Sequence, residues 1–121
     1  MILVADDDDD ILLLVTTRLK RDGFDVIEAR SGDEALALAQ ARQPDVAVLD
    51  VGMPGLDGLE VLERIRADDT LRGMRVLLLT AKAQESDARR GYDAGADAYV
   101  RKPFSPSELS TRVRALLAES P

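Results

Sequence analysis

The sequence contains no cysteine and no histidine among its 121 residues. Zinc sites with sulfur or nitrogen ligands, thiol nucleophiles, disulfide bonds and histidine acid–base catalysis are therefore excluded for this chain. Tryptophan is also absent and aromatic residues account for 3% of the chain, so leucine, valine, isoleucine and alanine must form the core. The chemistry that remains is that of carboxylates, hydroxyl groups and ammonium groups.

The chain also lacks a surplus of basic residues and any long apolar run. Its formal net charge is -7, so it has no basic surface with which to bind nucleic acid directly. No apolar run approaches the length of a membrane span, and no basic region precedes the first apolar residues, which argues against a membrane anchor or a signal peptide. We therefore expect no membrane partner, no direct binding of nucleic acid and a cytoplasmic location.

What the sequence does contain is a regular alternation of short apolar runs with helical patterns. Its length suits a single domain, residues 1–121, of which about residues 1–118 should be folded and the rest should form a short tail. The apolar runs predict strands at residues 1–5, 24–29, 45–50, 75–80 and 97–100. The second run alternates like an edge strand, whereas the third and fourth are continuously apolar and should be central.

Helices are predicted between these strands from apolar spacing and capping signals. The first covers residues 11–20, with the acids of residues 8–10 as its cap and first turn. Capping boxes open three more helices, at residues 31–34, 57–60 and 105–108. A helical pattern at residues 83–94 lacks a cap and large apolar residues, so it should be the least firmly held. These elements predict an α/β fold: a doubly wound five-stranded parallel sheet in the flavodoxin-like order 2-1-3-4-5, with helices on both faces.

Polar residues stand where the predicted strands end. Asp6 and Asp7 follow the first strand, Asp50 ends the third, Thr80 ends the fourth, and Lys102 comes just after the fifth. In the predicted order the first and third strands are neighbours, so the three aspartates should meet in one crevice, where they repel one another unless a cation joins them. Oxygen ligands favour Mg²⁺, for which Mn²⁺ can substitute. The hydroxyl and the ammonium group at the same edge predict a site that holds a phosphoryl group.

Each of these residues also has an ordinary structural interpretation. Asp6 and Asp7 can be helix-capping acids like their neighbours, and a threonine at a strand end commonly reflects β-propensity. Lys102, before a proline, can be a solvated loop residue, and Tyr99 is by default a core side chain with a hydrated hydroxyl. The functional interpretation is favoured because the aspartates, the threonine and the lysine fall at one edge of the predicted sheet.

Four sequence blocks resemble, in order and spacing, the receiver domains of two-component response regulators. The blocks are ILVADD at residues 2–7, LDVGMPGLDG at residues 49–58, LTA at residues 79–81 and GADAYVRKPF at residues 95–104. The resemblance covers the whole chain. It implies that the chain is a phosphorylation-dependent signalling switch, and not an enzyme beyond catalysing its own phosphorylation and dephosphorylation.

The resemblance also implies a role for each candidate residue. Asp50 would be the phosphoacceptor, Lys102 would bind the phosphoryl group, and Thr80 and Tyr99 would form the switch pair. The implied metal ligands are Asp6, Asp7, Asp50 and the backbone carbonyl of Gly52. After phosphorylation, Thr80 would move toward the phosphoryl group and leave space into which Tyr99 turns, so that the change reaches the fourth helix, the fifth strand and the last helix.

The partners implied are a sensor histidine kinase or a phosphotransfer protein, and an output domain outside this chain. The last helix, with Glu108 and Arg112, resembles the last helix of receivers that are attached to DNA-binding output domains. Those receivers often dimerise through the last two helices and the last strand, so a phosphorylation-dependent homodimer is also expected. Ala98 departs from that pattern, because many such receivers have a second acid there.

Three other functions compete with the switch. A magnesium phosphatase with an aspartyl nucleophile would also use Asp50, but such enzymes carry a second aspartate two residues later, where this chain has Gly52. A nucleotide-binding module would need a glycine-rich loop after the first strand, and none follows it. A receiver-like domain that signals by binding alone would not need Asp50, Asp7, Thr80 and Lys102 together.

Three further expectations concern backbone and kinetics. The Lys102–Pro103 bond should be cis, because Lys102 must turn back over the sheet within one residue of leaving its strand. The helix at residues 83–94 should carry the output, because it is the weakest. Gly52 and Lys82, two residues after Asp50 and Thr80, should largely set the lifetime of the phosphoryl group, since side chains at these positions could overhang it. Gly52 offers no side chain, and Lys82 either shields the phosphoryl group from water or lies in solvent.

Overall fold

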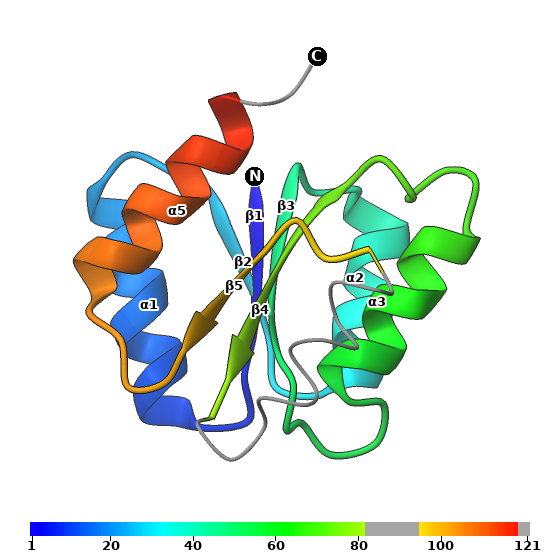
Figure 1. The fold of residues 1–121 in the computed structure, drawn as a ribbon, viewed down its shortest axis with the longest axis horizontal. Helices are drawn as coiled ribbons and strands as arrows, with labels where there is room; N and C mark the ends of the chain where they lie inside the picture. Colours follow the sequence, from blue (N-terminus) through cyan, green and yellow to red (C-terminus); the bar gives the residue numbers. More distant parts are fainter. Residues whose placement is uncertain (82–94, 119–121) are drawn as a thin grey trace.

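The computed structural model describes residues 1–81 and 95–118, which form one parallel sheet covered by helices on both faces (Figure 1). The strands are β1 (Ile2–Ala5), β2 (Val26–Ala29), β3 (Val46–Asp50), β4 (Arg75–Thr80) and β5 (Ala98–Arg101). The described helices are α1 (Asp9–Arg21), α2 (Gly32–Arg42), α3 (Gly58–Ala67) and α5 (Pro106–Ala118). All strand pairs are parallel and the order is β2-β1-β3-β4-β5, which confirms the predicted topology and the edge position of β2.

The core has two layers because successive side chains of a strand point to opposite faces of the sheet. Leu3 of β1 and Leu49 of β3 pack with α2 and α3, whereas Val4 and Val48 pack with α1 and α5. Strands buried on both faces leave no polar position until they end. In β1 and β3 the first polar side chains therefore appear at the carboxyl edge of the sheet.

Helix starts follow the capping signals. The Asp8 side chain accepts the N–H groups of Asp10 and Ile11 at 2.9 and 3.2 Å, so α1 begins at Asp9, two residues earlier than predicted. Both hydrogen bonds of the capping box at the start of α3 are present, between Asp57 and Glu60. Side chains also cap the two other helices, since Ser31 accepts from the Glu34 N–H and Ser105 from the Glu108 N–H.

The connection from β3 to α3 keeps the first turn of the helix against the end of the strand. The Gly58 N–H donates to the Val51 carbonyl at 3.3 Å. A Cβ added at Gly58 would lie 2.5 Å from the backbone oxygen of Asp50, so a larger residue cannot enter without moving that strand end. The start of α3 is therefore in direct contact with the last residue of β3.

The remaining predictions about the fold are confirmed, untested or concern residues outside the described ones. The Lys102–Pro103 bond is cis, as predicted. The helix predicted at residues 83–94 and the side chain of Lys82 lie outside the described residues. The single folded unit of about residues 1–118 with a short tail stays a prediction. Among the residues described, no helix is long and apolar enough to cross a membrane.

Candidate carboxylate site

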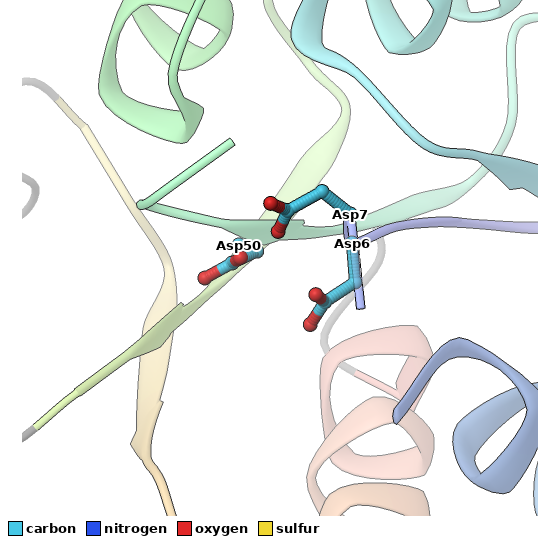
Figure 2. Close-up of side chains that lie close together, drawn as sticks. All are labelled: Asp6, Asp7 and Asp50. Carbon is cyan, nitrogen blue, oxygen red and sulfur yellow. The ribbon is translucent and has the colours of Figure 1, made fainter. Parts of the chain in front are cut away.

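Three carboxylates meet at the carboxyl edge of the two central neighbouring strands. Asp6 follows β1 and Asp50 ends β3, and these strands pair with Ala5 beside Leu49. One oxygen from each of Asp6, Asp7 and Asp50 lies within 4.8 Å of the others. Figure 2 shows the three side chains gathered at this edge. Asp6 is fully buried, Asp50 is 5% exposed and Asp7 faces solvent, so the cluster is reached from the side of Asp7.

Lys102 supplies a positive charge to this cluster from the far end of the sequence. Its Nζ donates to Asp6 Oδ2 at 3.1 Å and lies 3.3 Å from Asp50 Oδ1. The backbone supports this position, since the Lys102 N–H donates to the Thr80 carbonyl at 2.7 Å and the next bond is cis. The ammonium group therefore bridges the two buried carboxylates.

The environment of Asp50 opposes its ionised form. Burial and the charge of Asp6 raise the pKa of Asp50 from its ordinary value of 3.8 to about 6, although Lys102 and the Gly52 N–H both act against the rise. Burial alone would lower the pKa of Lys102, but the charges and hydrogen bonds of Asp50 and Asp6 raise it. The lysine therefore stays charged at neutral pH while Asp50 titrates near pH 6 in the metal-free protein.

This raised pKa predicts a pH-dependent stability difference. An acid whose pKa is higher in the folded than in the unfolded protein costs nothing below about pH 3.8 and its full penalty above about pH 6. In metal-free buffer, the wild type should therefore lose stability relative to Asp50→Asn as the pH rises from 4 to 7, by up to about 3 kcal/mol. Urea unfolding of both proteins across this range measures the difference. A difference that stays constant with pH, or that grows in the opposite direction, would contradict the prediction.

The donor set suits a hard divalent cation. The cluster offers only carboxylate oxygens, two of them partly neutralised by Lys102, and it contains no nitrogen or sulfur ligand. Gly52 lies at the mouth of the cluster, where its N–H donates to Asp50 Oδ1 at 3.3 Å. The residues thus fit Mg²⁺, with Asp6, Asp7, Asp50 and the Gly52 carbonyl as the predicted ligands.

Thr80 and Tyr99 lie on neighbouring strands and on the same side of the sheet. Tyr99 pairs with Leu78, and both pack toward α2 and α3; the strand alternation places Thr80 on that side too. Thr80 is 1% exposed and its hydroxyl donates to the Ala81 carbonyl at 3.2 Å. Thr80 therefore ends the strand next to β3, and Tyr99 lies one strand further out.

Sequence reasoning brought Asp6, Asp7, Asp50, Thr80 and Lys102 to this edge but missed two contacts. Lys102 was expected to contact a phosphoryl group, but its ion pairs with Asp6 and Asp50 were not predicted. Gly58 was not identified, although its close approach to the Asp50 carbonyl helps to fix the strand end. A signal for it was present, because glycine directly after a capping aspartate is a poor helix former and suggests a close backbone approach.

The sequence of this chain is similar to a known family and to curated proteins. A family model described as the response regulator receiver domain matches residues 2–114. The chain is 46% identical over 119 residues to the alkaline phosphatase synthesis transcriptional regulatory protein PhoP of Bacillus subtilis, with 98% of this chain and 49% of that protein covered. It is 45% identical over 116 residues to the DNA-binding dual master transcriptional regulator RpaA of Synechocystis sp., with 96% and 48% covered. The chain thus spans about half the length of the curated relatives it matches.

Solved structures of response regulators share the fold of this chain. A putative response regulator from Chloroflexus aurantiacus superposes with a TM-score of 0.92 at 37% identity, covering 98% of this chain and 97% of that one. The chemotaxis response regulator CheY4 of Vibrio cholerae superposes with a TM-score of 0.88 at 31% identity, covering 95% and 96%. Fold and sequence therefore agree over nearly the full length of both structures.

Proposed function

The chain belongs to the response regulator receiver domain family, and from this membership and the carboxylate site we propose that it is a phosphorylation-dependent switch of a two-component system. Asp50 accepts a phosphoryl group from a histidine kinase or a phosphotransfer protein. The observation that carries the proposal is the position of Asp50, buried beside Asp6 and Asp7 and contacted by Lys102 at 3.3 Å. A receiver is a signalling domain, and the chemistry that this one performs is the gain and loss of its own phosphoryl group.

In the proposed reaction an oxygen of Asp50 attacks phosphorus, the bond from phosphorus to the donor nitrogen breaks, and an acyl phosphate forms. Phosphoryl transfer depends mainly on positioning and on charge stabilisation, so an ionised carboxylate needs no general base. Lys102 turns from its carboxylate partners to a phosphoryl oxygen and stabilises the added charge there. Asp6, Asp7, Asp50 and the Gly52 carbonyl would hold Mg²⁺, which would supply further positive charge to the phosphoryl oxygens.

The signal is proposed to leave the site through the strand next to β3. The Thr80 hydroxyl, which donates to the Ala81 carbonyl in the unphosphorylated protein, turns to the acyl phosphate instead. Tyr99 then rotates into the space vacated beside β4. The change reaches the fourth helix predicted at residues 83–94, together with β5 and α5.

The partners are proposed from the family and from the curated relatives. Those relatives are named as transcriptional regulators and are about twice as long as this chain, which supports an output domain outside it. A phosphorylation-dependent homodimer and a cytoplasmic location stay predictions. A magnesium phosphatase is disfavoured because Gly52, which has no side chain, stands where such enzymes carry their second aspartate.

A metal-dependence assay tests the proposal. Incubation with acetyl phosphate and Mg²⁺ should add the mass of one phosphoryl group to the intact protein, and Mn²⁺ should replace Mg²⁺. The reaction should stop when the metal is chelated, since Asp6 and Asp50 would then repel the incoming phosphoryl oxygens. A gain of mass that is equally fast with chelator present would refute a metal-assisted receiver mechanism.

A further inference from the structure

Arg66, in the last turn of α3, joins three segments that are separate in the sequence. Its Nε and Nη2 donate to the Gly95 carbonyl at 3.0 and 2.8 Å, and Nη2 also donates to Asp97 Oδ2 at 2.9 Å. Its Nη1 donates to the carbonyls of Arg72 and Met74, in the connection from α3 to β4. All three nitrogens of the guanidinium group are thus engaged, and the side chain is only 21% exposed.

The residues that Arg66 holds determine where β5 begins. The Asp97 N–H donates to the Val76 carbonyl at 2.9 Å, and the Val76 N–H donates back to Asp97 Oδ2 at 2.8 Å. Arg75 contacts the other oxygen of this carboxylate at 3.4 Å. Gly95 has a φ of +105°, and a Cβ there would lie 3.1 Å from Arg66 Nε, so glycine permits the close approach. Arg66 therefore fixes the backbone that leads into β5.

β5 is one of the two edge strands of the sheet, so contacts at its ends matter for its position. It has four residues and, within the described part of the chain, pairs with β4 alone. It carries Tyr99 and leads directly to Lys102, whose Nζ bridges Asp6 and Asp50. A shift at the amino end of β5 would therefore move Tyr99, a member of the proposed switch pair, and Lys102.

The opposite end of α3 contacts the phosphorylation site. Gly58, the first residue of α3, donates to the Val51 carbonyl and lies so close to the Asp50 carbonyl that no Cβ fits. Between the two ends, Val61, Leu62 and Ile65 are completely buried against the sheet. A packed helix of ten residues transmits a displacement of one end to the other, because its backbone and core contacts deform little.

We propose that Arg66 is a positioning residue that couples the loop after Asp50 to the start of β5 through α3. This inference rests on the proposed function, since it requires that Asp50 becomes phosphorylated. The route runs from Asp50 through Gly58 to Arg66, and from there to Gly95 and Asp97. It is separate from the Thr80 hydroxyl and ends on the same strand, so phosphorylation acts on β5 from both of its ends.

Amide hydrogen exchange of residues 96–101, measured with and without phosphorylation, tests the coupling. The wild type should show a change in exchange rate of about 3- to 10-fold on phosphorylation. In Arg66→Met the exchange should be faster in both states and the change on phosphorylation should fall below about twofold. Arg66→Lys keeps the charge beside Asp97 but cannot reach all three carbonyls, so its change should also shrink. Arg64→Met, which removes one charge at an exposed position of the same helix, is the matched control and should behave as wild type.

The proteins are compared at equal phosphorylated fractions, which intact mass determines. A residue that merely braces the structure would speed exchange in both states by one factor and leave the change on phosphorylation intact, and that result in Arg66→Met would overturn the proposal. If Arg66→Met does not fold, Arg66→Lys decides by the same criterion. A phosphorylated wild type without any change at residues 96–101 overturns this inference alone, whereas a wild type that takes no phosphoryl group overturns the proposed function with it.

Discussion

Asp50→Asn should abolish the Mg²⁺-dependent addition of a phosphoryl group. Asparagine has nearly the same shape as aspartate but no nucleophilic carboxylate oxygen, so the acyl phosphate cannot form. The loss should exceed about 1000-fold in initial rate, because the covalent step itself is removed and not merely slowed. Intact mass after incubation with acetyl phosphate and Mg²⁺ measures the result.

The control must show that the loss does not come from a general change at the site. Asp57→Asn removes a carboxylate from the same connection, and asparagine also caps helices well, so α3 should be unaffected. This variant should gain one phosphoryl group at close to the wild-type rate. If Asp50→Asn still gains a phosphoryl group as fast as the wild type, another residue is the acceptor.

The sheet edge was predictable because apolar runs and polar breaks are local signals. The continuous run of β3 marks a strand buried on both faces, and Asp50 follows it without any intervening residue. Parallel strands must end at one edge, so the gathering of Asp6, Asp7 and Asp50 followed from the strand order alone. The capping boxes were equally local, and the box of Asp57 and Glu60 is fully formed.

The contacts that the sequence did not reveal join residues far apart in the chain. Lys102 and Asp6 are 96 positions apart, and their contact depends on where the chain turns after β5. Arg66 and Asp97 are 31 positions apart, and an arginine near the end of a helix is usually a solvated residue that favours the helix dipole. Helical spacing places Arg66, four residues after Leu62, nearer the buried side of α3 than the exposed Arg64, but it does not reveal which groups Arg66 contacts. Only the packing of α3 against the start of β5 gives Arg66 its partners.

Lys102→Met should separate the chemistry of the site from its affinity for metal. Methionine is an unbranched side chain one atom shorter than lysine, and it lacks the charge that bridges Asp6 and Asp50. Without the ammonium group, charge on the phosphoryl oxygens is stabilised less in the transition state. Removal of one such group typically costs about 10²- to 10³-fold in rate, so we expect a loss of about 100-fold, or about 2.7 kcal/mol.

The affinity for Mg²⁺ should respond in the opposite direction. Lys102 is ion-paired with two of the predicted ligands, Asp6 and Asp50, so a bound cation would compete with these ion pairs. Lys102→Met removes the competitor and leaves two buried carboxylates without a counter-charge, which favours the cation further. Titration calorimetry should therefore show an Mg²⁺ affinity that is equal to or higher than that of the wild type, while Lys20→Met, at an exposed position of α1, should change neither affinity nor rate.

The two measurements together decide the role of Lys102. If the lysine acts on the phosphoryl group, the rate loss persists at saturating Mg²⁺, because added metal cannot replace a charge at a different oxygen. If the lysine only organises the metal site, saturating Mg²⁺ restores the rate and the affinity falls. The 3.1 and 3.3 Å contacts of Nζ with Asp6 and Asp50 fit the first case, because they hold the ammonium group beside the carboxylate that would bear the phosphoryl group. Full recovery of the rate by added metal would therefore assign Lys102 to the metal site and not to the phosphoryl group.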